Sequence, residues 1–264
     1  MSARGPDDPR PRRIDVLGCP FDAVSFAETV AEIRAAVEQD SHLQVVPGNV
    51  DFVMKARRDP GFAADLARAD LVVADGVPVV WAASLLGRPL RGRVSGTDLV
   101  WSCADVARDT GRSVALVGGR PGVAERAARA LGDRYPGAAL HAVPTPMTLD
   151  EEASAILVEQ IRRVRAGIVL VALGAPRQER WVQTHLTACG AAVGIGVGSA
   201  FDIICGDQPR APHWMRGRGF EWLHRMALDP GRLGRRYLVE DSPFLFHLAV
   251  AVLRRGHRTP ERGA

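Results

Sequence analysis

The chain has 264 residues, of which 47% are hydrophobic and 24% charged, and its formal net charge is +4. This composition excludes a wholly disordered chain, and the length allows one or two domains with a sizeable core. The longest apolar stretch, residues 243–253, is interrupted by His247 and is shorter than the ~20 residues that a membrane-spanning helix needs.

The first 13 residues are polar, charged and proline-containing, so we expect a disordered lead without a secretory signal. After it, apolar runs alternate with helical patterns. The runs predict strands at residues 14–17, 43–46, 71–74, 113–117, 139–143, 168–173 and 192–197. Several are nearly continuous runs of Val, Leu, Ile and Ala, as in strands covered on both faces. The alternation predicts an α/β fold over residues 14–215: a Rossmann-like, mostly parallel sheet with helices on both faces.

Two helix starts carry a capping-box pattern. Ser25 with Glu28 forms the first, and Thr148 with Glu151 forms the second. Each is followed by apolar residues at helical spacing, so we expect helices to begin at these points.

The pattern changes after residue 215. Short helical pieces broken by Gly and Pro follow, and they predict a short helical C-terminal appendage at residues 216–264. This segment holds ten Arg and five acidic residues, a net charge of +5, so the first 215 residues carry −1. A basic tail suits nucleic acid, phosphate groups or an anionic membrane surface, although a solvated basic helix face would need no partner.

The four cysteines, Cys19, Cys103, Cys189 and Cys205, form no C-x-x-C pair and no metal-site spacing. We expect reduced thiols in a cytosolic protein.

Ligands of open α/β sheets bind at the carboxyl ends of the strands, so the residues after each apolar run are candidates. Asn49 follows the second run and could bind a ligand or cap a helix. Asp75 follows the third run, and could be a general base or the N-cap of a helix at 78–86.

Two further positions point to phosphate. Arg93 lies in the stretch 93–98 and could bind a phosphate, while Ser95 or, more simply, Thr97 would cap the next helix. Gly118 follows the fourth predicted strand of this series, where glycines could cradle a phosphate or only form a tight turn.

The last two apolar runs end in polar residues as well. Gln178 belongs to a crowded polar turn whose side chains could bond sugar hydroxyls or phosphate, or simply begin a solvated helix. Asp202 follows a glycine-rich strand end, and could accept a hydrogen bond from a base or sugar or serve as a cap.

Several motifs are absent from the sequence. It has no D-x-D triplet for a divalent metal, no G-x-S-x-G elbow and no Walker A loop. A nucleotide-dependent oxidoreductase predicts G-x-G-x-x-G after the first strand, where this chain has residues 17–21, LGCPF. A non-enzymatic nucleic-acid binder would explain the Arg-rich tail, but the tail resembles no recognition module, so we expect no nucleic-acid partner.

Taken in order, several segments resemble the WecG/TagA/CpsF family of bacterial glycosyltransferases. They are 49–52 (NVDF), 69–76 (ADLVVADG), 93–98 (RVSGTD), 172–181 (ALGAPRQERW), 196–202 (GVGSAFD), 210–215 (RAPHWM), 221–225 (EWLHR) and 229–237 (DPGRLGRRY). The resemblance covers roughly residues 43–246, and the joint order is far more specific than any one segment.

The resemblance implies an inverting, metal-independent transfer of a sugar, of N-acetylmannosamine or glucose type, from a UDP-sugar to a polyprenyl-diphosphate-linked glycan in cell-envelope or exopolysaccharide synthesis. It implies that Asp75 is the catalytic base and that no cofactor is needed. The positions that match substrate-contacting residues are Asn49, Arg93, Gln178 and Asp202. The positions that match arginines of the appendage, which close over the site and meet the lipid diphosphate, are Arg225, Arg232 and Arg235.

An acceptor held in lipid requires the enzyme to reach a bilayer. We therefore expect a cytoplasmic protein peripherally associated with the inner, anionic face of the cell membrane through its basic appendage. A homo-oligomer is compatible with the sequence. The family often has Thr two residues before the Asn, where this chain has Pro47, so a hydroxyl near the donor sugar is missing.

Overall fold

The computed structural model describes residues 13–146, 149–212, 215, 221–228, 230–235 and 239–256. Within them, the main element is a six-stranded sheet in the order β4-β3-β8-β7-β5-β6, with every neighbouring pair parallel. Its strands are β3 (Leu43–Gly48), β4 (Leu71–Ala74), β5 (Ser113–Gly118), β6 (Ala139–Val143), β7 (Ala166–Ala172) and β8 (Val193–Gly196). The predicted parallel α/β sheet is confirmed.

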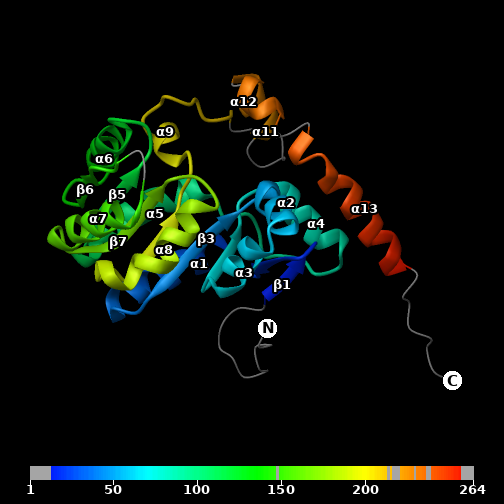
Figure 1. Ribbon diagram of the computed structural model, residues 1–264, viewed down its shortest axis with the longest axis horizontal. Coiled ribbons are helices and arrows are strands. Elements are labelled where there is room, and N and C mark those ends of the chain that lie inside the picture. Colours follow the sequence, from blue (N-terminus) through cyan, green and yellow to red (C-terminus); the bar gives the residue numbers. More distant parts are fainter. Residues whose placement is uncertain are drawn as a thin grey trace.

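Helices cover both faces of this sheet (Figure 1). Those before the appendage are α1 (Phe26–Gln39), α2 (Val50–Arg58), α3 (Pro60–Arg68), α4 (Val77–Leu85), α5 (Gly96–Thr110), α6 (Val123–Arg134), α7 (Glu151–Arg163), α8 (Arg177–Cys189) and α9 (Ala200–Ile204). Alternate residues of a strand point to opposite faces, and the buried clusters follow that rule. Leu170 packs with α1, α5, α6 and α9, whereas its neighbour Val169 packs with α7 and α8.

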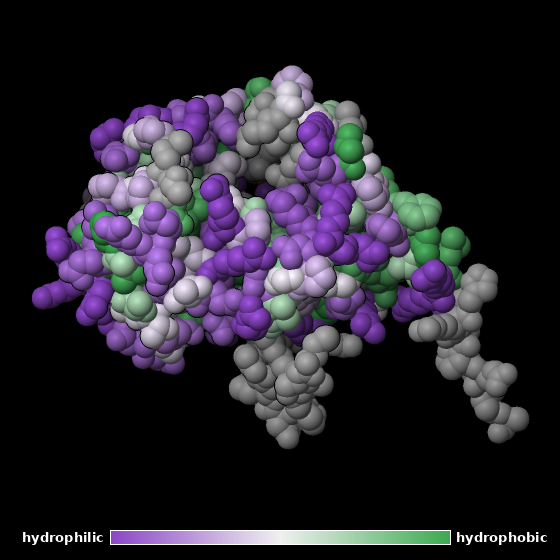
Figure 2. All heavy atoms as spheres, viewed as in Figure 1, coloured by the Kyte–Doolittle hydropathy of each residue, from purple (hydrophilic) through white to green (hydrophobic). Residues whose placement is uncertain are grey.

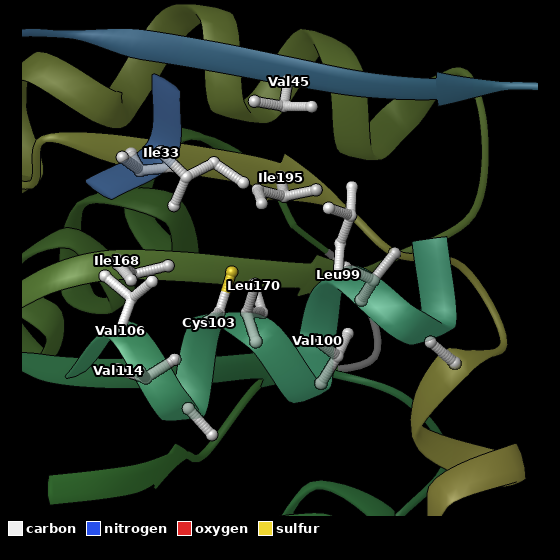
Figure 3. Close-up of a cluster of buried hydrophobic side chains, with 14 of the residues drawn as sticks. Ile33, Val45, Leu99, Val100, Cys103, Val106, Val114, Ile168, Leu170 and Ile195 are labelled. Carbon is white, nitrogen blue, oxygen red and sulfur yellow. The ribbon is translucent and has the colours of Figure 1, made fainter. Parts of the chain in front are cut away.

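The larger of these two clusters is close-packed around α5. Figure 3 shows Leu99 and Cys103 of α5 directed toward Leu170 and Ile195 of the sheet, with Ile33 of α1 beside them. All five side chains are at most 1% exposed. Burial of each such side chain contributes about 1.5–3 kcal/mol, so this face holds a large share of the stabilising apolar contacts.

The first predicted strand does not belong to the parallel sheet. β1 (Arg13–Val16) forms an antiparallel hairpin with β2 (Cys19–Asp22), an element that the sequence did not predict. Asp22 fastens the hairpin to the sheet: its buried carboxylate accepts 2.8 Å hydrogen bonds from the Arg13 guanidinium and from the Val72 backbone N–H. Arg13 is the first residue of β1, while the rest of the predicted disordered lead lies outside the described residues.

A third buried cluster joins this hairpin to α2, α3, α4 and the C-terminal helix α13 (Pro243–Gly256). Phe244 and Leu248 of α13 are buried in it, so the last helix is packed onto the α/β domain. The appendage also contains α11 (Glu221–Leu228) and α12 (Pro230–Arg235). Its predicted boundary at residue 216 stays a prediction. No helix within the described ranges has the length and apolarity to cross a membrane.

One of the two predicted helix starts is confirmed. Ser25 Oγ accepts from the Glu28 N–H at 3.2 Å, and Glu28 returns a bond to the Ser25 N–H at 2.8 Å. The second prediction is wrong, because α7 begins at Glu151 and its N-cap is Asp150, whose carboxylate accepts from the Ala153 N–H. Asp150 therefore takes the capping role that we expected of Thr148, which lies outside the described residues.

Candidate functional site

The carboxyl edge of the sheet gathers most of the predicted site residues. Asn49 and Asp75 directly follow β3 and β4, and Gly118 is the last residue of β5. Gln178 lies in the first turn of α8, after β7, and Asp202 lies in α9, after β8. Because all these strands run parallel, their ends share one edge, which is where open α/β sheets bind ligands.

Asp75 and Arg93 are brought together at this edge. Arg93 Nε lies 3.6 Å from Asp75 Oδ1, and both side chains are between one fifth and one third exposed. The second carboxylate oxygen, Oδ2, accepts a 3.1 Å hydrogen bond from the Gly96 backbone N–H at the start of α5. The carboxylate is therefore held from two sides while part of it stays open to solvent.

The alternative role of Asp75 as a helix cap is wrong. The N-cap of α4 is Gly76, which has no side-chain cap and adopts φ +155°, a conformation that L side chains rarely adopt. Asp75 is bonded to α5 instead. The cap of α5 is Ser95, whose Oγ accepts from the Asp98 N–H, and not Thr97.

Asn49 is the N-cap of α2, with its Oδ1 accepting from the Asp51 N–H at 3.1 Å. The capping alternative is thus confirmed, and a role in substrate binding stays a prediction. Pro47, which replaces the Thr common in the resembled family, borders Asp75: a Cβ placed on Gly96 would lie 3.4 Å from Pro47 Cβ and 3.3 Å from Asp75 Oδ2. The hydroxyl that Thr would supply is therefore absent next to Asp75, the candidate base.

Gly118 forms a tight turn. Its φ is +88°, and a Cβ there would lie 2.7 Å from the Ala172 carbonyl oxygen. Its N–H donates to Thr145 Oγ1 at 2.9 Å, and the next N–H, from Gly119, donates to the Ala172 carbonyl. Both amides are used inside the protein, which favours the tight-turn alternative over a phosphate cradle.

Gln178 is only 3% exposed and links two strand ends. Its Oε1 accepts from the Gly174 N–H at 3.1 Å and from the Gly198 N–H at 3.2 Å, so it joins the loop after β7 to the loop after β8. Its Nε2 donates to Glu179 Oε1 at 2.7 Å. Gln178 therefore holds these two loops together at the carboxyl edge. Its direct contact with substrate stays a prediction.

Glu179 is a buried carboxyl that the sequence reasoning did not single out. It is 2% exposed, its Oε2 has no hydrogen-bond partner among the described residues, and burial raises its pKa from 4.5 to about 7. The hydrogen bond from Gln178 and the nearby Lys55 ammonium oppose this rise. The helical register offered a signal: Glu179 lies on the same face of α8 as the buried Val182 and Leu186.

Asp202 is held by Arg120, a second residue that the sequence reasoning missed. Arg120 Nε and Nη2 donate to Asp202 Oδ1 at 3.0 and 2.7 Å. Arg120 belongs to the loop after β5, so the pair connects the ends of two strands that are separated by β7 in the sheet. Its position directly after a Gly-Gly strand end was the available signal.

Of the three appendage arginines predicted to bind diphosphate, the structure describes the side chain of one. Arg225 and Arg232 belong to α11 and α12, but their side chains lie outside the described part of the structure. Arg235 is largely exposed and lies 3.6 Å from Glu240 Oε1. Among the described residues, no three His, Cys, Asp or Glu side chains form a group that could hold a metal ion.

This arrangement suits transfer chemistry at the carboxyl edge of the sheet. It offers a half-open carboxylate that could accept a proton, a guanidinium beside it that could stabilise negative charge, and a second carboxylate, Asp202, that could accept from a ligand N–H or O–H.

Comparison with known proteins points the same way. The model of the family described as "Glycosyl transferase WecG/TagA/CpsF family" matches residues 14–258. Curated relatives named N-acetylglucosaminyldiphosphoundecaprenol N-acetyl-beta-D-mannosaminyltransferase, from Staphylococcus aureus strains NCTC 8325 / PS 47 and COL, are each 30% identical over 241 residues. The alignments cover 90% of this chain and 93% of each relative.

Proposed function

Because the chain belongs to the WecG/TagA/CpsF family of glycosyltransferases, we propose that it transfers a sugar from a UDP-sugar to a polyprenyl-diphosphate-linked acceptor in cell-envelope polysaccharide synthesis. The S. aureus relatives are named for N-acetylmannosamine transfer to N-acetylglucosaminyldiphosphoundecaprenol, so these are the first donor sugar and acceptor to test. The observation that carries the proposal is the partly exposed Asp75 carboxylate, held by Gly96 and Arg93 at the carboxyl edge, where Gly76 and not Asp75 is the N-cap of α4.

In the proposed reaction, the acceptor hydroxyl oxygen attacks the anomeric carbon of the donor sugar. The bond from that carbon to the UDP oxygen breaks, UDP leaves with the electron pair, and the configuration inverts. Asp75 accepts the hydroxyl proton. The Gly96 N–H and the Arg93 guanidinium would orient the carboxylate for this step.

The leaving UDP develops negative charge on its diphosphate. Guanidinium groups stabilise such charge through bidentate hydrogen bonds, and we assign this role to Arg93. Arg225, Arg232 and Arg235 of the appendage would pair with the diphosphate of the acceptor, or of UDP. Transfer would then proceed without a divalent metal. Asn49, Gln178 and Asp202 would shape the donor site, with Gly118 forming the turn at its border.

The proposed acceptor is anchored in a membrane, and one face of the molecule suits docking there. Trp81, Leu85, Leu245, Phe246 and Leu253, on α4 and α13, are large apolar side chains that are each more than half exposed. Figure 2 shows hydrophobic residues gathered on the side where these two helices lie. Arg254 and Arg255 end α13, so the apolar face is followed by positive charge that complements anionic headgroups.

A direct assay tests the proposal. The full-length protein would be incubated with a panel of UDP-sugars, including UDP-N-acetylmannosamine, and a short-chain lipid-diphosphate N-acetylglucosamine acceptor. We expect product with a UDP-sugar, with an inverted anomeric centre, at the same rate with and without EDTA. Loss of transfer in EDTA and its recovery with Mn²⁺ or Mg²⁺ would refute metal independence, and absence of product with every donor would refute the transferase assignment.

A further inference from the structure

Arg120 is joined to two acids at the carboxyl edge of the sheet. In addition to its two bonds to Asp202 Oδ1, its Nη2 donates to Asp207 Oδ2 at 3.0 Å. Asp207 also pairs with Arg126 of α6. Two arginines and two acids thus form one network that ties the loop after β5 and the start of α6 to α9 and the turn that follows it.

The backbone explains why Arg120 lies there. Gly118, Gly119 and Gly122 all have positive φ, at +88°, +82° and +76°, which folds the chain sharply around Arg120 and Pro121. A Cβ on Gly119 would lie 3.8 Å from the Phe201 ring, so this turn lies directly against α9. The turn therefore presents Arg120 to the residue after Phe201, which is Asp202.

The two bonds to Asp202 end on a single oxygen. Within the part of the chain that the structure describes, Asp202 Oδ2 accepts no hydrogen bond, although a carboxylate oxygen offers two acceptor sites. The Asp202 side chain is only 12% exposed, so its rotation is confined by its surroundings. Arg120 holds one oxygen and thereby determines where the other one points.

We propose that Arg120 is a positioning residue for the donor nucleotide: it orients Asp202 so that Oδ2 accepts a hydrogen bond from an N–H or O–H of the nucleoside. This inference rests on the proposed function, because it takes the donor to be a UDP-sugar. Arg120 also balances the charge of two acids near the expected diphosphate. Without it, Asp207 would keep Arg126, but Asp202 would lose the guanidinium paired with it among the described residues, and its negative charge would oppose binding of an anionic donor.

The test compares three variants of the full-length protein by calorimetric titration with UDP and by steady-state kinetics. Arg120→Ala should raise the Kd for UDP and the KM for the donor about tenfold, because a charge-assisted contact is misaligned, while kcat at saturating donor stays within about twofold. Arg120→Lys should recover part of the affinity, since a Lys can still pair with Asp202. Arg126→Ala is the matched control: it removes the contacts of Arg126 with Asp207 and Cys205 but leaves Arg120 on both acids, and should change the Kd less than about twofold.

The outcomes separate this inference from the proposed function. Wild-type UDP affinity in Arg120→Ala, with weakened affinity in Asp202→Asn, would overturn the role of Arg120 and leave the donor site intact. The inference would also be overturned if Arg120→Ala, Arg120→Lys and Arg126→Ala all lowered kcat, UDP affinity and Tm together. That result would show that the network is purely structural. Absence of UDP binding to the wild-type protein would instead overturn the proposed donor. A weaker Kd for 2′-deoxy-UDP in the wild type but not in Asp202→Asn would identify the ribose 2′-hydroxyl as the bonded group, and equal ratios would assign the bond to the 3′-hydroxyl or the base.

Discussion

Glu179 Oε1 accepts a 2.7 Å hydrogen bond from Gln178 Nε2 inside the protein, and Gln178 Oε1 in turn accepts the N–H groups of Gly174 and Gly198. A buried carboxyl thus determines which way the Gln178 amide faces. If Gln178 were turned over, its NH₂ group would meet two backbone donors and both contacts would be lost. The shape of two strand ends therefore depends on a side chain that no ligand needs to touch.

The raised pKa of Glu179 makes stability depend on pH. Below pH 4.5 the carboxyl is protonated in both states and contributes no penalty. Between pH 4.5 and about 7 the unfolded chain loses its proton first, so stability falls as pH rises, and above about 7 the full penalty remains. Glu179→Gln keeps an acceptor for Gln178 and does not titrate. We expect its free energy of unfolding, relative to that of the wild type, to rise by roughly 3 kcal/mol from pH 4.5 to pH 8.

Urea denaturation at both pH values would measure this difference. The exposed Glu159→Gln on α7 serves as the control and should show no comparable change. A constant difference between Glu179→Gln and wild type at the two pH values would contradict the assigned pKa.

Gly196 and Gly132 should respond in opposite ways to alanine. A Cβ on Gly196 would lie 2.7 Å from both Gln178 Nε2 and Glu179 Oε1, so Gly196→Ala should cost about 1–3 kcal/mol and disturb the site. On Gly132, within α6, the nearest atom would be 3.9 Å away, so Gly132→Ala should stabilise by about 0.5–1 kcal/mol. Thermal unfolding of the two variants checks this, and a neutral Gly196→Ala would show that the Gln178–Glu179 contact can move aside.

Asp75→Asn should lower kcat by about 10²–10⁴-fold while UDP binding survives, because Asn keeps the size of the side chain and loses the proton acceptor. The matched control is Asp105→Asn on α5, an exposed acid that pairs with Arg108. Steady-state kinetics with a soluble acceptor supply the measurement. Near-wild-type turnover in Asp75→Asn would leave Asp75 with a structural role toward Gly96 only.

Arg235→Ala, and likewise Arg232→Ala, should lower transfer about tenfold or more even to a water-soluble acceptor, because a diphosphate loses a guanidinium partner. Truncation before residue 216 should abolish transfer, provided that circular dichroism shows the remaining chain to be folded. Full-length rates in a folded truncated protein would show that the appendage does not complete the site.

The double substitution Leu245→Glu with Phe246→Glu should abolish co-sedimentation with phosphatidylglycerol vesicles and leave transfer to a soluble acceptor unchanged. Both side chains are about 70% exposed on α13, so the substitutions remove apolar docking area and add charge of the wrong sign without opening the core. Ile156→Glu, at a 54% exposed position on α7, is the control and should keep vesicle binding. Retained binding by the double variant would exclude this face as the docking surface.

The sequence predicted the sheet well because most of its strands are buried on both faces. Residues 71–74 form a strand with the predicted ends, since a continuous apolar run bounded by Asp70 and Asp75 leaves little freedom. The ends of the more exposed strand 139–143 were also predicted correctly. The β1–β2 hairpin was missed because Cys19–Asp22 is short, contains Pro20 and is stabilised by the distant contact of Asp22 with Val72. A local sequence pattern does not predict a contact between residues so far apart in the chain.

The same distinction applies to the site. The strand-end rule located Asn49, Asp75 and Asp202, because topology alone brings those positions to one edge. It missed Arg120, which meets Asp202 across 82 residues of chain. It also missed the burial of Glu179, which depends on how α8 packs against β8.

The strand order has a consequence for the synthesis of the protein. β8 lies between β3 and β7, yet it is the last strand of the sheet to be made. As the chain leaves the ribosome, β3 can pair with β4, and β5 can pair with β6 and β7, but these two groups have no shared neighbour until residues 193–196 emerge. Until then the facing edges of β3 and β7 expose unpaired backbone groups that could pair with another nascent chain. Gly194 and Gly196 leave room for α8 and its buried polar pair to pack over β8 once it is inserted, and this insertion pairs the two exposed edges.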